Sequence, residues 1–253
     1  MNIEELRKNW KSEEQNAMIK GWDFSHIKGR FYSEEDDLPW DYKAVINRYR
    51  RSTDKLLDID TGGGELLLSL GHPFENTFAT EGYPPNVELC RKVLGKLGIG
   101  FHKVTDYETM PFPDSFFDVV INRHGAYEAE ELYRILKPGG FFITQQVGED
   151  NDRELVEKLL PGAEKRFEGH DLSHCISELT NAGFSVIESG EAFRPISFFD
   201  TGALVWFAKI IEWEFIGFSV DKCFEKLLAT EEEIREKGRI SGRIHRFYIA
   251  ARK

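Results

Sequence analysis

The sequence lacks the features that mark membrane, secreted and disulfide-rich proteins. No apolar run in its 253 residues approaches the roughly 18 residues that a membrane-spanning helix needs. The first fifteen residues, MNIEELRKNWKSEEQ, contain no apolar signal-peptide core. The three cysteines, Cys90, Cys175 and Cys223, are far apart and form no C-x-x-C pair. We therefore expect free thiols in the reducing cytoplasm and no association with membranes.

Positive charge is also scarce, with 33 lysines and arginines against 44 acidic residues and a net charge of −11. A protein that binds nucleic acid usually presents a basic face. Residues 237–252 could form a local basic patch, although a solvated surface is the simpler interpretation; the basic residues there are Lys237, Arg239, Arg243, Arg246 and Arg252. The acidic balance favours a small-molecule substrate over nucleic acid.

One stretch, Leu56 to Glu65 with the sequence LLDIDTGGGE, organises the rest of the chain. An apolar strand-like run leads into three glycines, and a helix-compatible run follows. A strand, a glycine turn and a helix open nucleotide-binding α/β domains, because glycine lets the backbone turn tightly and approach a ligand. The phosphate-binding pattern G-x-G-x-x-G fails at Leu67. With Asp58 ahead of the turn, a cationic ligand fits better than a dinucleotide, which weakens the alternative of a nicotinamide-dependent oxidoreductase.

Three further blocks follow in order. Thr77–Thr80 reads as a short strand that ends at Glu81, whose two carboxylate oxygens can bind both hydroxyls of a ribose. A third strand, Phe101–Val104, precedes Asp106 and Tyr107, and MPFPDSFFDVVIN contains a fourth strand over Phe117–Asn122. In EELYRILKPGGFFI, Pro138 should end a helix, and the two glycines after it should turn the chain into a fifth strand.

These blocks resemble class I S-adenosylmethionine (SAM)-dependent methyltransferases, and more narrowly the methyltransferase type 11 pattern. LLDIDTGGGE is similar to motif I, MPFPDSFFD to the segment that introduces strand 4, and EELYRILKPGGFFI to the helix, K-P-G-G turn and strand 5. One position departs from the family, because Asp60 stands where its first glycine usually lies. Aspartate tolerates positive φ better than most residues do.

The resemblance implies an α/β fold with a Rossmann-like sheet of seven strands, mostly parallel with an antiparallel strand 7, and helices on both faces. It implies SAM as cofactor across the carboxyl ends of the strands. Asp58 and the glycine turn would face the methionine part, Glu81 the ribose, Asp106 and Tyr107 the adenine, and Asn122 and Arg123 the path of the methyl group. The implied cofactor-binding residues are Asp58, Asp60, Thr61, Gly62, Gly64, Glu81, Gly82, Asp106, Tyr107, Asn122 and Arg123.

Methyl transfer from a sulfonium requires mainly that the nucleophile be aligned, and a base is needed only when the nucleophile must lose a proton. His124, just past strand 4, is the best-placed general base by sequence, and the alternative is a structural or solvent-facing histidine. The group HDLSHC could place His170 and His174 on one helix face, with Ser173 as a helix cap. Nothing near it completes a ligand set, so no metal site is expected.

The predicted organisation is an N-terminal arm over residues 1–41 and a methyltransferase domain over residues 42–253. Strand 6 is predicted at Phe184–Glu188 and strand 7 at His245–Ala251, with an insertion at about residues 192–243 between them. Arm and insertion are rich in aromatic residues. We expect the arm to act as a lid and four tryptophans to wall the substrate pocket, namely Trp22, Trp40, Trp206 and Trp213. The alternative is that these aromatics form core.

The sequence therefore predicts an enzyme, a SAM-dependent methyltransferase that acts on an unidentified acceptor, most simply a small molecule. Two alternatives stay open. An RNA base methyltransferase would need a basic rim around the cofactor mouth. A SAM-binding protein without catalysis would draw its support from Asp60 in the glycine turn.

Overall fold

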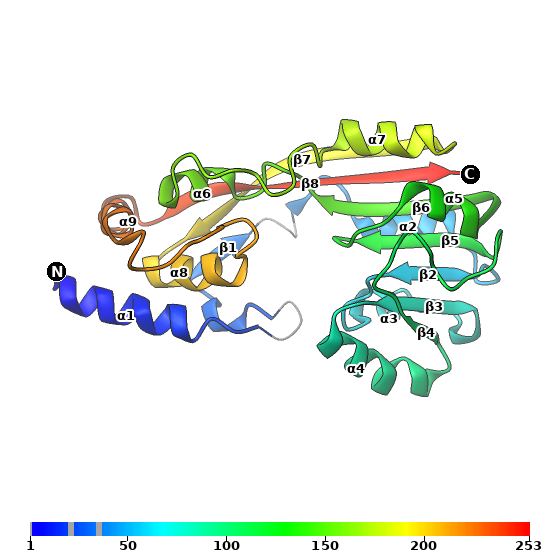
Figure 1. The fold of residues 1–253 in the computed structure, drawn as a ribbon, viewed down its shortest axis with the longest axis horizontal. Helices are drawn as coiled ribbons and strands as arrows, with labels where there is room; N and C mark the ends of the chain where they lie inside the picture. The colour runs from blue at the N-terminus through cyan, green and yellow to red at the C-terminus, as the bar shows by residue number, and fades with distance from the viewer. Residues whose placement is uncertain (1, 20–22, 34–36) are drawn as a thin grey trace. The chain divides into compact units, whose positions relative to one another are not determined.

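The computed structural model describes residues 2–19, 23–33 and 37–253, and the chain divides into two compact units (Figure 1). We name them the α/β unit and the helical unit. The α/β unit contains Pro39–Gly148, His170–Glu191 and Arg246–Lys253. The helical unit contains Met1–Leu38, Glu149–Gly169 and Ala192–His245. Two long strands, β7 (Ser185–Phe198) and β8 (Ile240–Arg252), contribute residues to both units.

The α/β unit is built on parallel strands. The pairings β2–β3, β2–β5, β3–β4 and β5–β6 are all parallel, and β8 pairs antiparallel with β6. The strands are β2 (Leu56–Ile59), β3 (Thr77–Glu81), β4 (Gly100–Lys103), β5 (Phe117–Arg123) and β6 (Leu136–Val147). The complete sheet has the order β1-β7-β8-β6-β5-β2-β3-β4. The predicted fold class is confirmed, with eight strands in place of seven.

The extra strand is β1 (Phe31–Ser33), which pairs antiparallel with the end of β7 through Phe31 opposite Phe198. Its three residues lie in the aromatic segment before the first predicted strand, where no alternation marks so short an element. Strands 6 and 7 were predicted at the right places, but β7 and β8 are much longer than Phe184–Glu188 and His245–Ala251.

Helices cover both faces of the parallel strands. Leu57 and Ile59 of β2 pack in one core cluster with residues of α5 (Ala129–Ile135) and α7 (Leu172–Asn181). Leu56 packs in another with residues of α2 (Tyr42–Tyr49), α3 (Glu65–Ser69) and α4 (Pro84–Val93). Successive side chains of a strand point to opposite faces, so a strand buried at every position reads as a continuous apolar run.

The predicted turn at Pro138-Gly139-Gly140 is an irregular part of β6 instead. The pairing with β5 shifts from Phe117 opposite Leu136 to Val119 opposite Phe141, so the segment between them bulges. Gly139 has φ +81°, and a Cβ on Gly140 would lie 2.9 Å from the Asp118 carbonyl oxygen. A helix precedes this segment and a strand follows it, as predicted, but α5 ends at Ile135 and β6 begins at Leu136, before Pro138. The glycines serve a bulge and a close backbone approach.

The helical unit has its own apolar core. Its helices are α1 (Ile3–Gln15), α6 (Arg153–Leu159), α8 (Thr201–Ile210) and α9 (Phe224–Lys237). Helix α8 is buried along most of its length, and Trp10 of α1 and Ile27 pack in the same cluster as its side chains. Arg30 also binds the N-cap residue of α8, Asp200, through two hydrogen bonds of 2.8 and 2.6 Å. Short 3-10 turns occur at Ser25–Ile27, Phe74–Asn76 and Gly95–Leu97.

None of the helices in the described ranges is long and apolar enough to cross a membrane.

Candidate functional site

The glycine turn after β2 contains a non-glycine residue in the left-handed region. Asp60 has φ +55°, followed by Gly62 at +64° and Gly64 at +89°, and Gly64 is the N-cap of α3. The turn is fixed by the Thr61 N–H, which donates to the Thr80 carbonyl at 3.0 Å, and by the Gly64 N–H, which donates to the Thr61 carbonyl at 3.0 Å. Left-handed backbone geometry costs an L-residue about 1–2 kcal/mol, so the conformation of Asp60 lowers the stability of the turn.

The glycines of this site differ in the space that a Cβ would find. A Cβ on Gly62 would meet no protein atom within 4 Å, so the space beside it is open. A Cβ on Gly64 would lie 2.8 Å from Leu94, and one on Gly82 would lie 2.6 Å from the Val104 carbonyl oxygen. Gly64 and Gly82 are therefore required by packing, whereas Gly62 leaves room for a ligand.

Two carboxyl groups lie at the end of β2, where Asp58 is buried and Asp60 is half-buried. Asp58 is only 2 % exposed, and burial raises its pKa to about 7; the hydrogen bond from the Thr61 hydroxyl (2.6 Å) opposes the shift, while the charges of Asp60 and Glu81 add to it. Burial also raises the pKa of Asp60 to about 6, against the hydrogen bond of 2.5 Å from the Tyr107 hydroxyl. Negative charge is thus concentrated where a bound cation would relieve it.

Glu81 at the end of β3 is held by four N–H groups. One oxygen accepts from the backbone of Gly82 (2.8 Å) and Tyr83 (2.9 Å). The other accepts from the backbone of Gly62 (2.9 Å) and from Asn86 Nδ2 (3.2 Å). A carboxylate offers about four lone-pair positions, so ribose hydroxyls could bind Glu81 only by replacing some of these donors. Ribose binding by Glu81 stays a prediction.

The loop after β4 reaches the glycine turn through one of its two predicted adenine-binding residues. Tyr107 donates its hydroxyl proton to Asp60, and burial together with this bond raises the pKa of the phenol. Asp106 is exposed, and its carboxylate accepts the N–H of Glu108 at 2.9 Å. Tyr107 is therefore tied to the turn, whereas Asp106 faces solvent.

The three residues predicted at the end of β5, Asn122, Arg123 and His124, have different surroundings. Asn122 is fully buried; its Nδ2 donates to the Ile59 carbonyl (3.1 Å), and its Oδ1 accepts from Thr144 (3.2 Å) and Gln146 (2.6 Å). Its side chain thus holds the strand ends together. Arg123 is exposed, and its charge lowers the pKa of Asp58.

His124 follows at φ +61°, where its N–H donates to the Gln145 carbonyl at 2.9 Å. Both of its ring nitrogens are shielded from water. A general base must reach the proton that it removes, so the catalytic role of His124 stays a prediction that requires the ring to turn toward the acceptor.

Two further residues support the site and were not predicted from the sequence. The Tyr42 hydroxyl lies 2.8 Å from the Asn122 carbonyl and 2.9 Å from that of Ile143, so it links α2 to β5 and β6. The Cys90 thiol donates to the Gly62 carbonyl at 3.1 Å, and burial raises its pKa to about 12, which keeps the proton in place. Neither residue belongs to a local motif, so only the tertiary structure identifies them.

The predicted tryptophan wall is described in part. Trp22 lies outside the described residues. In the α/β unit, Trp40 donates to Gln145 Oε1 at 2.8 Å and packs on Tyr248 with 4.9 Å between ring centroids. In the helical unit, Trp206 is 1 % exposed in the core, and Trp213 packs against the same cluster. Packing already accounts for these last two rings, and a role in the substrate pocket stays a prediction.

The HDLSHC segment has a structural arrangement. Asp171, not Ser173, is the N-cap of α7, since its Oδ1 accepts the His174 N–H at 2.9 Å and its Oδ2 lies 2.8 Å from His174 Nδ1. Cys175 Sγ lies 3.7 Å from His170 Nδ1. Over residues 2–19, 23–33 and 37–253, the structure contains no group of three or more His, Cys, Asp or Glu arranged to hold a metal ion.

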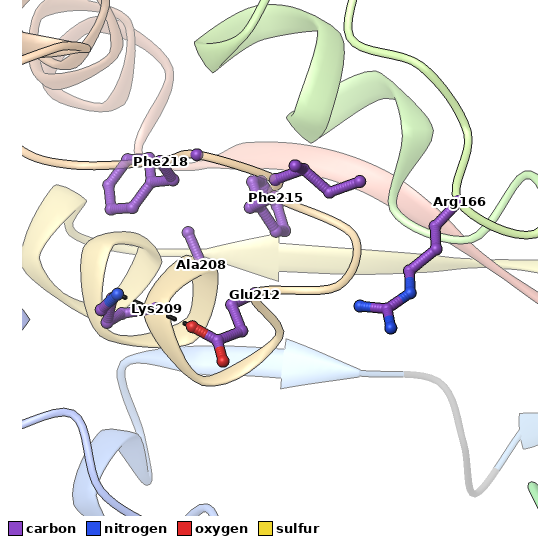
Figure 2. A pocket seen from close by; sticks show the side chains of 8 residues that line it. Arg166, Ala208, Lys209, Glu212, Phe215 and Phe218 are labelled. Atoms are coloured by element: carbon purple, nitrogen blue, oxygen red, sulfur yellow. Dashed lines mark ion pairs between the residues drawn. The ribbon is translucent and has the colours of Figure 1, made fainter.

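The helical unit contains a surface hollow of about 400 Å³ that was not anticipated (Figure 2). It lies at the end of α8, with Arg166 contributed by the loop after α6, and an ion pair of 3.7 Å joins Lys209 to Glu212. The lining residues are Arg166, Ala208, Lys209, Glu212, Phe215, Ile216, Gly217 and Phe218. No predicted site residue is among them.

Comparison with known proteins matches the site to one family. Residues 57–144 match the family model described as a methyltransferase domain. Demethylmenaquinone methyltransferase of Thermus thermophilus is 32 % identical over 128 residues, which cover 47 % of this chain and 58 % of that protein. Phthiotriol/phenolphthiotriol dimycocerosates methyltransferase of Mycobacterium tuberculosis is 28 % identical over 149 residues, covering 48 % and 54 %. The chain spans about half the length of these curated relatives.

The fold is similar to that of a solved structure. A crystal structure of a putative methyltransferase from Bacillus halodurans superposes with a TM-score of 0.58 at 20 % identity, covering 84 % of this chain and 98 % of that one. This likeness shows the fold. Residues 57–144 also match the methyltransferase domain model, in agreement with the resemblance to class I SAM-dependent methyltransferases that the sequence blocks indicated.

Proposed function

We propose that the protein transfers a methyl group from SAM to a small-molecule acceptor. The acidic glycine turn carries this proposal, because Asp58, Asp60 and Glu81 surround a turn that leaves open space at Gly62. SAM is a cation through its sulfonium and amino groups, and when bound it supplies an already activated methyl group. An anionic site without a phosphate-binding glycine pattern fits this ligand better than it fits a dinucleotide.

The residues of the α/β unit divide the work of binding. Asp58 and Asp60 offset the positive charge of the methionine part. Glu81 takes the ribose hydroxyls in exchange for some of its present N–H donors, and the loop with Asp106 and Tyr107 flanks the adenine. The enzyme's main contribution to rate is alignment of the acceptor with the methyl group, and His124 removes a proton when the acceptor carries one.

The acceptor class follows from charge and from the relatives. Both curated relatives are named for small-molecule acceptors rather than nucleic acid. A basic rim for RNA finds little support, because Lys237 pairs with Glu233 at 3.0 Å and Arg243 pairs with Glu154. The buried free thiols Cys90, Cys175 and Cys223 suit the cytoplasm, where we place the reaction.

The test is a methyl-transfer assay with SAM labelled in its methyl group. The purified protein is incubated in parallel with a pooled small-molecule extract and with total RNA, and the D58N variant serves as the impaired control. We expect label in the small-molecule fraction, and much less with D58N. Label confined to RNA would refute the acceptor class. Tight SAM binding with no label in either fraction would favour the non-catalytic alternative.

A further inference from the structure

The half-buried carboxylate of Asp60 lies against the loop that follows β5. Its Oδ2 accepts from the Tyr107 hydroxyl at 2.5 Å, and a hydrogen bond from the backbone N–H of Ala126 also lowers the pKa of this carboxylate. A Cβ on Gly125 would lie 2.7 Å from Asp60 Cβ and 2.8 Å from Asp60 Oδ2, so the loop after β5 passes directly against this side chain.

The charges facing Asp60 are mostly negative. Asp58 precedes it on β2 and Glu81 ends β3. The charge of Glu81 raises the pKa of both Asp58 and Asp60, and the charge of Asp60 raises that of Asp58. The other titratable groups of the neighbouring elements are Tyr107 after β4, the Cys90 thiol on α4, Tyr42 on α2 and His124 after β5. The positive charge that acts on the pair is that of Arg123, which is exposed to solvent. The site therefore carries more negative charge than its own residues balance.

We propose that Asp60 makes this site selective for the sulfonium cation, and that SAM binding releases a proton from the Asp58–Asp60 pair. The inference rests on the proposed function and goes beyond it. In the free protein near pH 6 the pair holds a proton; when the cation enters, a carboxyl O–H bond breaks, the proton passes to the buffer and the carboxylate stays with the cation. The demethylated product, S-adenosylhomocysteine, lacks the sulfonium charge and gains less from the second carboxylate.

The direction of the pH dependence follows from this. Burial raises the pKa of Asp58 to about 7 and that of Asp60 to about 6, and a bound cation lowers both values because it favours the charged forms. SAM affinity should thus fall as the pH drops through this range, by about tenfold per pH unit for one coupled proton. The affinity for S-adenosylhomocysteine should change less, so the preference for SAM over the product should shrink at low pH.

Isothermal titration calorimetry tests the inference directly. Wild type, D60N and Y107F are titrated with SAM and with S-adenosylhomocysteine at about pH 6 and pH 8, in buffers of different ionisation enthalpy, so that the number of released protons is measured. Asparagine keeps the shape of Asp60 and tolerates its positive φ, which makes D60N a charge-only change. Retained binding of S-adenosylhomocysteine and an unchanged circular dichroism spectrum show that the variant is folded.

We expect wild type to release close to one proton at the lower pH and almost none at the higher. D60N should lose about tenfold or more in SAM affinity, lose much less for the product, and release fewer protons. Y107F should move the pH midpoint upward, because it removes the hydrogen bond that lowers the pKa of Asp60. Proton-free SAM binding at both pH values, or equal weakening of both ligands by D60N, would overturn the inference and leave the proposed function standing. A wild type that binds neither ligand would overturn both.

Discussion

Replacing Asp58 by asparagine should stabilise the protein above neutral pH and weaken its binding of SAM. Asp58 is 2 % exposed, and its principal interaction, with the Thr61 hydroxyl, needs only an acceptor oxygen that asparagine also provides. The substitution therefore removes a buried negative charge while it preserves the local hydrogen bond. Replacing a ligand-binding residue of this kind raises the stability of the fold and lowers the affinity for the ligand.

The magnitude follows from the pKa of Asp58, which burial raises from 3.8 to about 7. The folded protein holds a proton that the unfolded chain has released, so stability falls as pH rises between these two values and stays low above the upper one. Three pH units correspond to a cost on the order of 4 kcal/mol at pH 8, which D58N avoids. For a chain of this size the gain is roughly 10 °C in Tm. Below about pH 4 the variant and wild type should coincide.

The assay is thermal unfolding followed by circular dichroism across this pH range, for wild type, D58N and E130Q. Glu130 is an exposed carboxylate of α5 in the same unit, so E130Q controls for the loss of one negative charge without burial. E130Q should follow wild type throughout. The reasoning is refuted if D58N is less stable than wild type at pH 8, or if its advantage does not grow with pH.

Two further predictions concern the turn and the carboxylate that binds it. G62A should weaken SAM binding by tenfold or more in calorimetry, because its methyl group enters space that is free of protein atoms, whereas G71A, with a similar positive φ (+62°) and equal room, should cost similar stability and leave SAM binding intact. Equal SAM affinity in both variants would mean that the turn does not contact the ligand. E81Q places an amide NH2 against two of the four N–H groups that now donate to Glu81, so it should lower Tm and weaken SAM binding by about 1.5–3 kcal/mol. An unchanged Tm and SAM affinity would remove Glu81 from both roles.

The parts of the fold that the sequence predicted well are those with strong local patterns. The strand-like run of Leu56, Leu57 and Ile59 lies in β2, because a central strand buried on both faces reads as an apolar run. The ends of β7 and β8 were not predicted. Residues 192–198 and 240–244 lie outside the two predicted strands, and their pairing depends on segments distant in the chain. Strand β1 was missed for the same reason.

The candidate site shows the same division between local and tertiary information. The acidic turn, Glu81 and Tyr107 were predicted from motif positions, and Asp60 has the positive φ that glycine usually supplies at its place in the motif. The hydrogen bonds that these side chains make could not be predicted from the sequence. The Tyr107–Asp60 bond joins residues 47 apart in sequence, and the Cys90–Gly62 bond joins residues 28 apart. Asn122 was predicted beside the ligand, which stays a prediction; its amide makes hydrogen bonds to Ile59 and Gln146 that the sequence did not indicate.

The central claim is that the acidic glycine turn of the α/β unit binds SAM. It is tested most directly by calorimetric titration of the purified protein with SAM and, in a matched experiment, with NAD at about pH 8, where Asp58 and Asp60 are ionised. The account predicts saturable binding of one SAM per chain and no measurable binding of NAD. Binding of NAD in preference to SAM, or no binding of SAM by the folded protein, would contradict it.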